Sequence, residues 1–202
     1  MELKDIIAVN RLYRPFYPYL ARQVMEVYGR TSGWALELGP YAPGISIALL
    51  GLLPDLKITV ADDTPGIHAY FRESLTEAGM AGRVLLKEAP VEDLPYPNWT
   101  FDLIYFRGGL FFSWDPVKLL RETDRLLRPG GVGLIGGGFG AGASDFAIEA
   151  IADEARELNQ RLGKKAVSEK EAEAFAREAG VLDHIGLDTR HGLWILLRRP
   201  PI

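Results

Sequence analysis

The chain has 202 residues, the length of one ordinary domain. Hydrophobic residues make up 48% and charged residues 25%, which excludes disordered, collagen-like and low-complexity chains. The net charge of -4, with no basic patch, argues against a nucleic-acid partner. Because the chain has no cysteine, disulfides, thiolate metal sites and cysteine nucleophiles are excluded. There is no apolar run of transmembrane length, and the charged N-terminus is unlike a signal peptide. We therefore expect no membrane partner and a cytoplasmic location.

The first 30 residues are expected to be helical. Apolar side chains recur at helical spacing from Leu20 to Tyr28. Prolines 15 and 18 interrupt the aromatic stretch before them, so the main helix is expected to start near Pro18.

Short apolar strands then alternate with amphipathic helices. The strands are predicted at residues 34–38, 57–61, 83–87, 101–106 and 132–135. Thr64 is predicted as the N-cap of the second intervening helix, with Pro65 at its first position. Asp115 is predicted to cap the helix before the fifth strand, and residues 128–131 to end it.

The last third of the chain begins with a glycine-rich stretch at 136–143, which is expected to be a mobile cover or hinge. A long helix with inward residues between 147 and 162 follows. Ser168 and Glu171 have capping-box spacing and open a helix that Gly180 ends. Two strands, at 184–189 and 193–197, are joined by a short link through His191, which predicts an antiparallel pair.

This order predicts an α/β fold, a Rossmann-like doubly wound sheet that is mostly parallel with a C-terminal antiparallel hairpin. Such sheets bind ligands beyond the carboxyl ends of their strands, where the strand order reverses. Gly39 follows the first strand, and Asp62 follows the second strand 23 residues later. A glycine permits close approach of a ligand, and an acid at this place accepts hydrogen bonds from ribose hydroxyls.

Several longer strings occur in a fixed order: LELG at 36–39, VAD at 60–62, EDLPY at 92–96, FDLI at 101–104 and LLRPGG at 126–131. Together with the terminal hairpin, they make the chain resemble the class I S-adenosylmethionine-dependent methyltransferases of the small-molecule type. The resemblance covers nearly all of the chain from about Trp34. It implies one methyltransferase-like domain at 1–202, with lid helices at 1–30 and the Rossmann-like core at 31–202.

The resemblance also implies roles for individual residues. Asp62 would bind the ribose hydroxyls, with its neighbour Asp63 beside the adenine, and Val91 and Glu92 would lie against the adenine ring. Glu37 would order the loop near the methionine part, and Arg107 would lie where that part meets the acceptor. The cofactor-binding residues implied are Glu37, Gly39, Pro40, Tyr41, Asp62, Asp63, Val91, Glu92 and Arg107.

Two features depart from the family pattern. In the loop that usually reads E-x-G-x-G-x-G, Tyr41 and Pro43 replace the second and third glycines, and Gly44 comes one position late. The acid that usually meets the adenine amino group is replaced by Pro90. A tyrosine ring at a point of close approach can block a ligand, so weakened or repositioned cofactor binding is a competing expectation.

Other residues have both structural and functional interpretations. Tyr13, Tyr17, Phe112 and Trp114 are candidate substrate contacts, with packing as the alternative for each. Arg107 would suit a carboxylate of the cofactor or acceptor, or pair with an acid such as Glu92 or Asp62. No metal site is predicted, because no histidine pair has ligand spacing.

Methyl transfer to a small molecule is therefore the leading hypothesis, with S-adenosylhomocysteine as product. The alternative is a methyltransferase-like chain that has lost catalysis and acts as a binding or assembly subunit. A nicotinamide-dependent oxidoreductase fits less well, because the middle glycine of its motif is missing. The sequence carries no signature of the acceptor or of a catalytic base, for which Tyr17 and His68 are loosely placed candidates. A monomer and a homodimer are both compatible with it.

Overall fold

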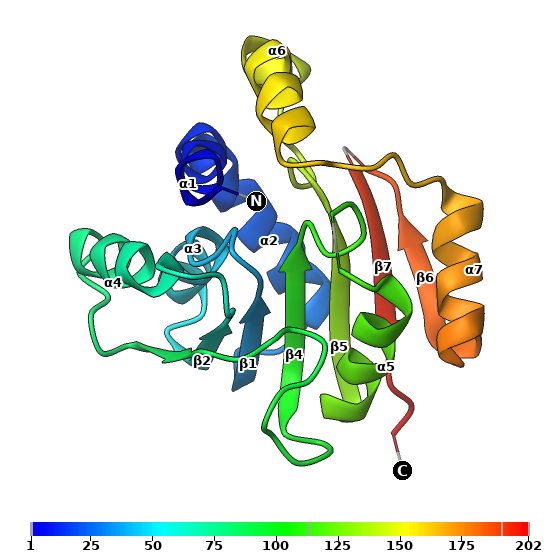
Figure 1. Cartoon of the computed structure of the whole chain (residues 1–202). Helices are drawn as coiled ribbons and strands as arrows, with labels where there is room; N and C mark the ends of the chain where they lie inside the picture. Colours follow the sequence, from blue (N-terminus) through cyan, green and yellow to red (C-terminus); the bar gives the residue numbers. More distant parts are fainter. Residues whose placement is uncertain (1, 113, 191, 202) are drawn as a thin grey trace.

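The computed structural model describes residues 2–112, 114–190 and 192–201 (Figure 1). Its centre is one sheet, whose described strands run in the order β3-β2-β1-β4-β5-β7-β6. The pairs from β3 to β5 are parallel, whereas β7 is antiparallel to both β5 and β6. The strands are β1 (Ser32–Leu38), β2 (Asp55–Ala61), β3 (Val84–Lys87), β4 (Phe101–Arg107), β5 (Leu127–Gly138), β6 (Ile185–Asp188) and β7 (Gly192–Arg198). The predicted α/β class and the C-terminal antiparallel pair are confirmed.

Helices pack on both faces of this sheet, with α2 and α3 behind it and α5 and α7 in front in the view of Figure 1. Their apolar faces bury a continuous core with the sheet, in which Leu36, Ile104 and Leu134 are essentially inaccessible to solvent. The α-helices are α1 (Leu3–Leu12), α2 (Tyr17–Tyr28), α3 (Gly44–Leu52), α4 (Ile67–Glu77), α5 (Pro116–Leu126), α6 (Asp145–Arg161) and α7 (Glu169–Ala179).

The N-terminal region is helical, as expected, but in three pieces. A short 3₁₀ turn, η1 (Arg14–Phe16), joins α1 to α2 where Pro15 interrupts the aromatic stretch. Gly29 ends α2 in the left-handed conformation, φ 67°. In Figure 1, α1 and α6 lie above the end of the sheet to which β4 points, so they stand over the edge at which a ligand is expected.

Several predicted caps are confirmed. The carboxylate of Asp115 accepts from the amides of Val117 and Lys118 at the start of α5. Ser168 and Glu171 form the reciprocal capping box of α7, and Gly180 ends that helix. Thr64 was expected to cap α4, but the helix begins at Ile67 after a turn. The N-cap is Gly66, and Thr64 lies in the turn before it, where its amide donates to the Asp62 carboxylate at 2.8 Å and its carbonyl oxygen accepts from the Ile67 amide.

The expected mobile glycine stretch is wrong for residues 136–138. These residues continue β5, which begins at Leu127 and pairs with β7 from Val132 to Gly138. A Cβ atom on Gly136 would overlap the backbone of Leu193 and Trp194, so only glycine allows this approach. Gly140, further on, lies against the backbone of α2 for the same reason. In the described residues, no helix is both long and apolar enough to cross a membrane.

Candidate active site

The candidate site lies where β1, β2 and β4 end. Between β1 and β4 the chain order of the sheet reverses, because β2 and β3 lie on one side of β1 and β4 and β5 on the other. Ligands of open α/β sheets bind in the crevice at such a switch point. The structure brings the residues after these three strands, 39–44, 62–64 and 107–109, to the same edge.

Glu37 lies inside this edge, at the end of β1. Its side chain is 2% exposed and accepts from both the amide and the hydroxyl of Ser46, the amide at 3.0 Å. The Ser46 hydroxyl is also 2.8 Å from the hydroxyl of Tyr105. Burial raises the pKa of Glu37 to about 7, against the opposing effect of the Ser46 hydrogen bonds. In this structure, Glu37 therefore fixes the first turn of α3 to β1.

The loop between β1 and α3 is folded against the N-terminal helices. Gly39 has φ 90°, and a Cβ atom there would overlap the ring of Phe106. The carbonyl oxygens of Pro40 and Ala42 accept from the side-chain amide of Asn10 on α1, at 3.0 and 3.5 Å. Packing within the protein thus accounts for the glycine at 39, and Pro40 contacts α1.

Tyr41 turns its ring over the end of β4. The residue is 1% exposed, and its ring lies so close to Gly108 that a Cβ atom there would collide with it. The ring centroid is 5.1 Å from that of Phe112 and 4.9 Å from the guanidinium carbon of Arg107. The tyrosine at the second glycine position therefore covers the backbone at 108 in this structure.

Arg107 is a buried cation inside a set of aromatic rings. It is 7% exposed, and its guanidinium carbon is 4.4 Å from the ring centroid of Tyr13 and 5.8 Å from that of Tyr17. One Nη atom donates to Asn10 at 3.3 Å, whereas Nε has no hydrogen-bond partner among the residues that the structure describes. No carboxylate in the described part of the chain forms an ion pair with it, so neither Glu92 nor Asp62 is its partner here.

Asp62 is a second buried charge-bearing group, at the end of β2. It is 1% exposed, and one carboxylate oxygen accepts from the Thr64 amide. Burial raises its pKa to about 6, although the bonds from Thr64 oppose the shift. His68 lies 2.8 Å from its backbone oxygen. Asp63, by contrast, is exposed.

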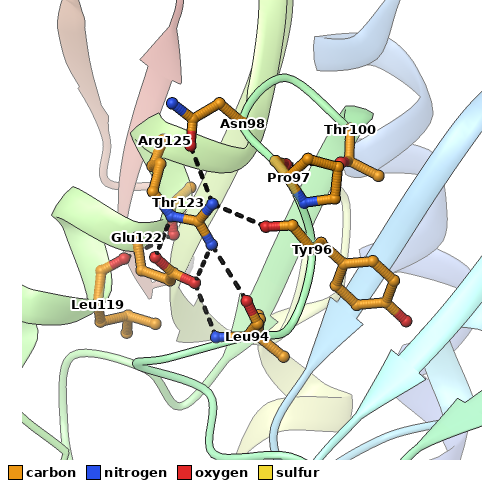
Figure 2. Close-up of polar contacts among 9 residues, drawn as sticks. All are labelled: Leu94, Tyr96, Pro97, Asn98, Thr100, Leu119, Glu122, Thr123 and Arg125. Atoms are coloured by element: carbon orange, nitrogen blue, oxygen red, sulfur yellow. Dashed lines mark hydrogen bonds and ion pairs between the residues drawn. The ribbon is translucent and has the colours of Figure 1, made fainter.

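The loop between β3 and β4 carries Val91 and Glu92. Val91 is 2% exposed, and the Glu92 carboxylate accepts from the amide of Asp115, which ties the loop to the start of α5. Figure 2 shows a second tie further along the loop. The guanidinium of Arg125 donates to the carbonyl oxygens of Leu94 and Tyr96, at 3.1 and 2.7 Å.

The same arginine forms an ion pair with Glu122, at 2.7 Å, and that carboxylate accepts from the Leu94 amide at 2.8 Å. The EDLPY string is therefore a loop held in place by α5 (Figure 2). Sequence reasoning missed Glu122 and Arg125, although their spacing of three residues on a helix is a usable signal.

The four candidate substrate residues separate into two groups. Trp114 packs against both Phe112 and Phe106, at centroid distances of 5.9 and 4.8 Å. Tyr17 donates its hydroxyl to Asn10, and burial raises its pKa, so it stays protonated and is a poor base. Tyr13 stacks on Phe139 and borders an open cavity.

This cavity has a volume of about 880 Å³ and lies between α6 and the ends of β5 and β7. Aromatic rings from three segments line it, together with the glycines at the end of β5 and a lysine after α6. Its aromatic and charged lining residues include Tyr13, Phe111, Phe139, Asp145, Arg156 and Lys164. Neither Lys164 nor Asn10 was anticipated. Asn10 could have been found as a polar residue at helical spacing among Ile6, Val9 and Tyr13.

Comparison with known proteins agrees with this architecture. Residues 36–135 match a family model described as a methyltransferase domain. A structure of a candidate S-adenosyl-L-methionine-dependent methyltransferase from Methanococcus maripaludis superposes with a TM-score of 0.81 at 24% identity. The superposition covers 100% of this chain and 94% of that one. The apo structure of the S-adenosylmethionine-dependent methyltransferase SibL gives 0.66 at 25% identity over 91% of this chain and 54% of that one.

Among curated proteins, the ubiquinone/menaquinone biosynthesis C-methyltransferase UbiE of Geobacter sulfurreducens is 31% identical over 113 residues. That match covers 56% of this chain and 40% of the relative. UbiE of Cronobacter sakazakii is 39% identical over 75 residues, 37% of this chain and 30% of the relative. The chain thus matches less than half the length of these curated relatives.

The fold, the switch-point site and the family match define a Rossmann-like methyltransferase domain. The chain belongs to the class I S-adenosylmethionine-dependent methyltransferases.

The residues at the site fit the cofactor of this class. A buried carboxyl stands at the end of β2, where ribose hydroxyls would be met, and a buried guanidinium with a partnerless Nε stands at the end of β4. An anionic group such as a methionine carboxylate would complete the hydrogen bonding of that guanidinium. The Tyr41 ring covers the space beside Gly108, so access to this end requires the ring to move.

Proposed function

We propose that the chain is an enzyme that transfers the methyl group of S-adenosylmethionine to a small-molecule acceptor. The observation that carries the proposal is the buried carboxyl of Asp62, at the end of β2 and beside the β1–β4 switch point. Burying an acid is costly even where its carboxylate accepts a hydrogen bond from a neighbouring amide, here that of Thr64. A ligand with two adjacent hydroxyl groups would donate hydrogen bonds to the carboxylate and so offset the free energy of its desolvation.

The remaining cofactor contacts are assigned to residues at the same edge. Arg107 would pair with the methionine carboxylate, since it has an unused donor and no acidic partner in the described residues. Val91 and Glu92 would lie beside the adenine, on the loop that α5 holds in place. Residues 1–30 would act as a lid, because α1 and the start of α2 cover Arg107 and the loop at 39–44.

When bound, S-adenosylmethionine supplies a sulfonium whose methyl group is already strongly electrophilic. The protein then needs mainly to hold the acceptor in line and to exclude water. The rings of Tyr13, Phe111 and Phe139 give the adjacent cavity an apolar wall for that purpose. The hydroxyl of Tyr17 stays protonated and donates to Asn10, so its role is to position α1 rather than to accept a proton.

The test is a calorimetric titration of the full chain with S-adenosylhomocysteine. We expect micromolar binding in the wild type, and a loss of at least tenfold in Asp62→Asn, which cannot accept from two hydroxyls as a carboxylate does. Asp63→Asn is the matched control, because this neighbouring acid is exposed and should bind like the wild type. A thermal-shift check at about 100 times Kd should raise Tm by roughly 5–10 °C.

The same titration separates this proposal from a non-catalytic binding subunit. If folded wild-type chain binds no S-adenosylhomocysteine at millimolar concentration, the Tyr41 ring closes the site and the methyl-transfer proposal fails. If Asp62→Asn binds as tightly as the wild type, the placement of the ribose at the end of β2 is wrong.

A further inference from the structure

The cavity between α6 and the ends of β5 and β7 contains a cation without an acidic partner. Lys164 follows the end of α6, and its ammonium lies 5.2 Å from the centroid of the Phe111 ring. In the described part of the chain no carboxylate forms an ion pair with it. Two backbone hydrogen bonds fix its place: the Lys164 amide donates to Asn159 at 2.9 Å, and the Lys165 amide to Phe111 at 2.6 Å.

The other charges that line the cavity do not neutralise this lysine. Arg156 is itself a cation, and the acid beside it, Asp153, is paired with it at 2.8 Å. Asp145 is the first residue of α6, whereas Lys164 follows the last residue of that 17-residue helix, so the two lie at opposite ends of it. Behind the ring of Tyr13 lies Arg107, which adds a second positive charge on the same side.

These two cations act on each other. Desolvation by the surrounding atoms lowers the pKa of Lys164, and the positive charge of Arg107 lowers it further. An anionic group in the cavity would relieve this repulsion, so the field selects for a negatively charged acceptor.

The other residues that line the cavity determine which shape and polarity of acceptor it can bind. Tyr13 and Phe139 are stacked with centroids 5.3 Å apart, and Phe111 lies under the lysine. A volume of about 880 Å³ is in the range of sites for small organic ligands. Such a lining favours an apolar, flat body rather than a sugar or an amino acid.

We propose that the acceptor is a carboxylate with an apolar body, held in this cavity with its carboxylate on the ammonium of Lys164. This inference rests on the proposed methyl transfer, since it names the class of molecule that receives the methyl group. It assigns Lys164 as the residue that selects acceptors by charge, and the three aromatic rings as the surface for the apolar body.

The test compares 2-naphthoate with its neutral isostere 2-naphthamide, by calorimetry on full chain that is saturated with S-adenosylhomocysteine. We expect naphthoate to bind at least about tenfold more tightly than naphthamide, as a charge-assisted hydrogen bond provides. Lys164→Gln should weaken naphthoate to the level of naphthamide and leave naphthamide unchanged. Lys164→Arg should restore most of the preference.

Lys165→Gln is the matched control. Both lysines are exposed, but Lys165 is not among the residues that line the cavity, so its removal should keep the preference for naphthoate. Equal affinity for the two probes, or an unchanged preference in Lys164→Gln, would overturn the proposal. Binding of neither probe at millimolar concentration, by chain that does bind S-adenosylhomocysteine, would overturn it as well. A further outcome is that S-adenosylhomocysteine does not bind, while the chain still binds naphthoate more tightly than naphthamide and loses this preference in Lys164→Gln. In that case the methyl-transfer proposal fails, but the assignment of the cavity as an anion-binding site holds.

Discussion

Glu37 shows what a single buried acid contributes to this site. Its carboxylate holds the first turn of α3 through Ser46, so it acts on the position of the loop at 39–44 and touches no open space. The family pattern alone assigns it to the methionine part of the cofactor. The structure explains the same residue by its hydrogen bonds to a helix N-terminus, where a negative charge is favoured.

The raised pKa of Glu37 makes a prediction about stability. The unfolded chain releases this proton near pH 4.5 and the folded chain near 7, so the folded state loses stability as the pH rises through that window. The side chain of Glu37→Gln stays neutral at every pH. The free energy of unfolding of this variant should therefore rise by about 3 kcal/mol relative to that of the wild type as the pH is raised from 4.5 to 8. Urea unfolding at several pH values measures the difference, with the exposed Glu77→Gln as control. A difference that does not change with pH would show that the Glu37 carboxyl titrates normally.

At the scale of elements, the tie between α5 and the loop after β3 sets the shape of one side of the site. Arg125 supplies donors to two loop carbonyl groups and neutralises Glu122, which is 8% exposed (Figure 2). Arg125→Met keeps a long side chain but leaves this acid and both carbonyl oxygens without their partner.

We therefore expect Arg125→Met to lower the free energy of unfolding by about 2–4 kcal/mol, because it leaves a largely buried charge unpaired. Lys118→Met, on the exposed face of the same helix, should change it by less than about 0.5 kcal/mol. Chemical unfolding of the two variants side by side gives the comparison. Equal stabilities would mean that the contacts of Arg125 do not hold the loop at 92–98.

The order and type of these elements could be predicted from the sequence because their signals are local. Apolar runs fix the strands, and Asp115, Ser168 and Gly180 mark helix ends by short-range hydrogen bonds and backbone conformation. The strand at 136–138 was missed because its glycines are required by β7, more than fifty residues later in the chain. From the local sequence alone, consecutive glycines predict a loop. At residues 136–138 they form a strand instead, because only glycine lets the backbones of β5 and β7 approach so closely.

At the scale of the whole molecule, the site joins segments that lie far apart in the sequence. Gly39 and Asp62 could be placed from the sequence, because each directly follows a predicted strand at the same edge of the sheet. The aromatic rings around Arg107 could not be placed from the sequence, because their positions depend on how α1 and α2 pack on the end of β4. The position of Lys164 likewise depends on the docking of the chain after α6 against Phe111.

Asn10 joins these parts, because its side chain contacts Pro40, Tyr17 and Arg107. Asn10→Ala removes the side-chain partner of the Pro40 carbonyl and of the Arg107 guanidinium, and leaves the Tyr17 hydroxyl only the backbone oxygen of residue 10, at 3.3 Å. We expect the amides of α1 to exchange with deuterium at least about tenfold faster than in the wild type, while those of β4 are unchanged. Arg11→Ala, an exposed change on the same helix, is the control and should leave exchange in α1 within about threefold. Faster exchange in β4 to the same degree would show that α1 is part of the global folding unit. Unchanged exchange in α1 would show that Asn10 does not hold it over the site.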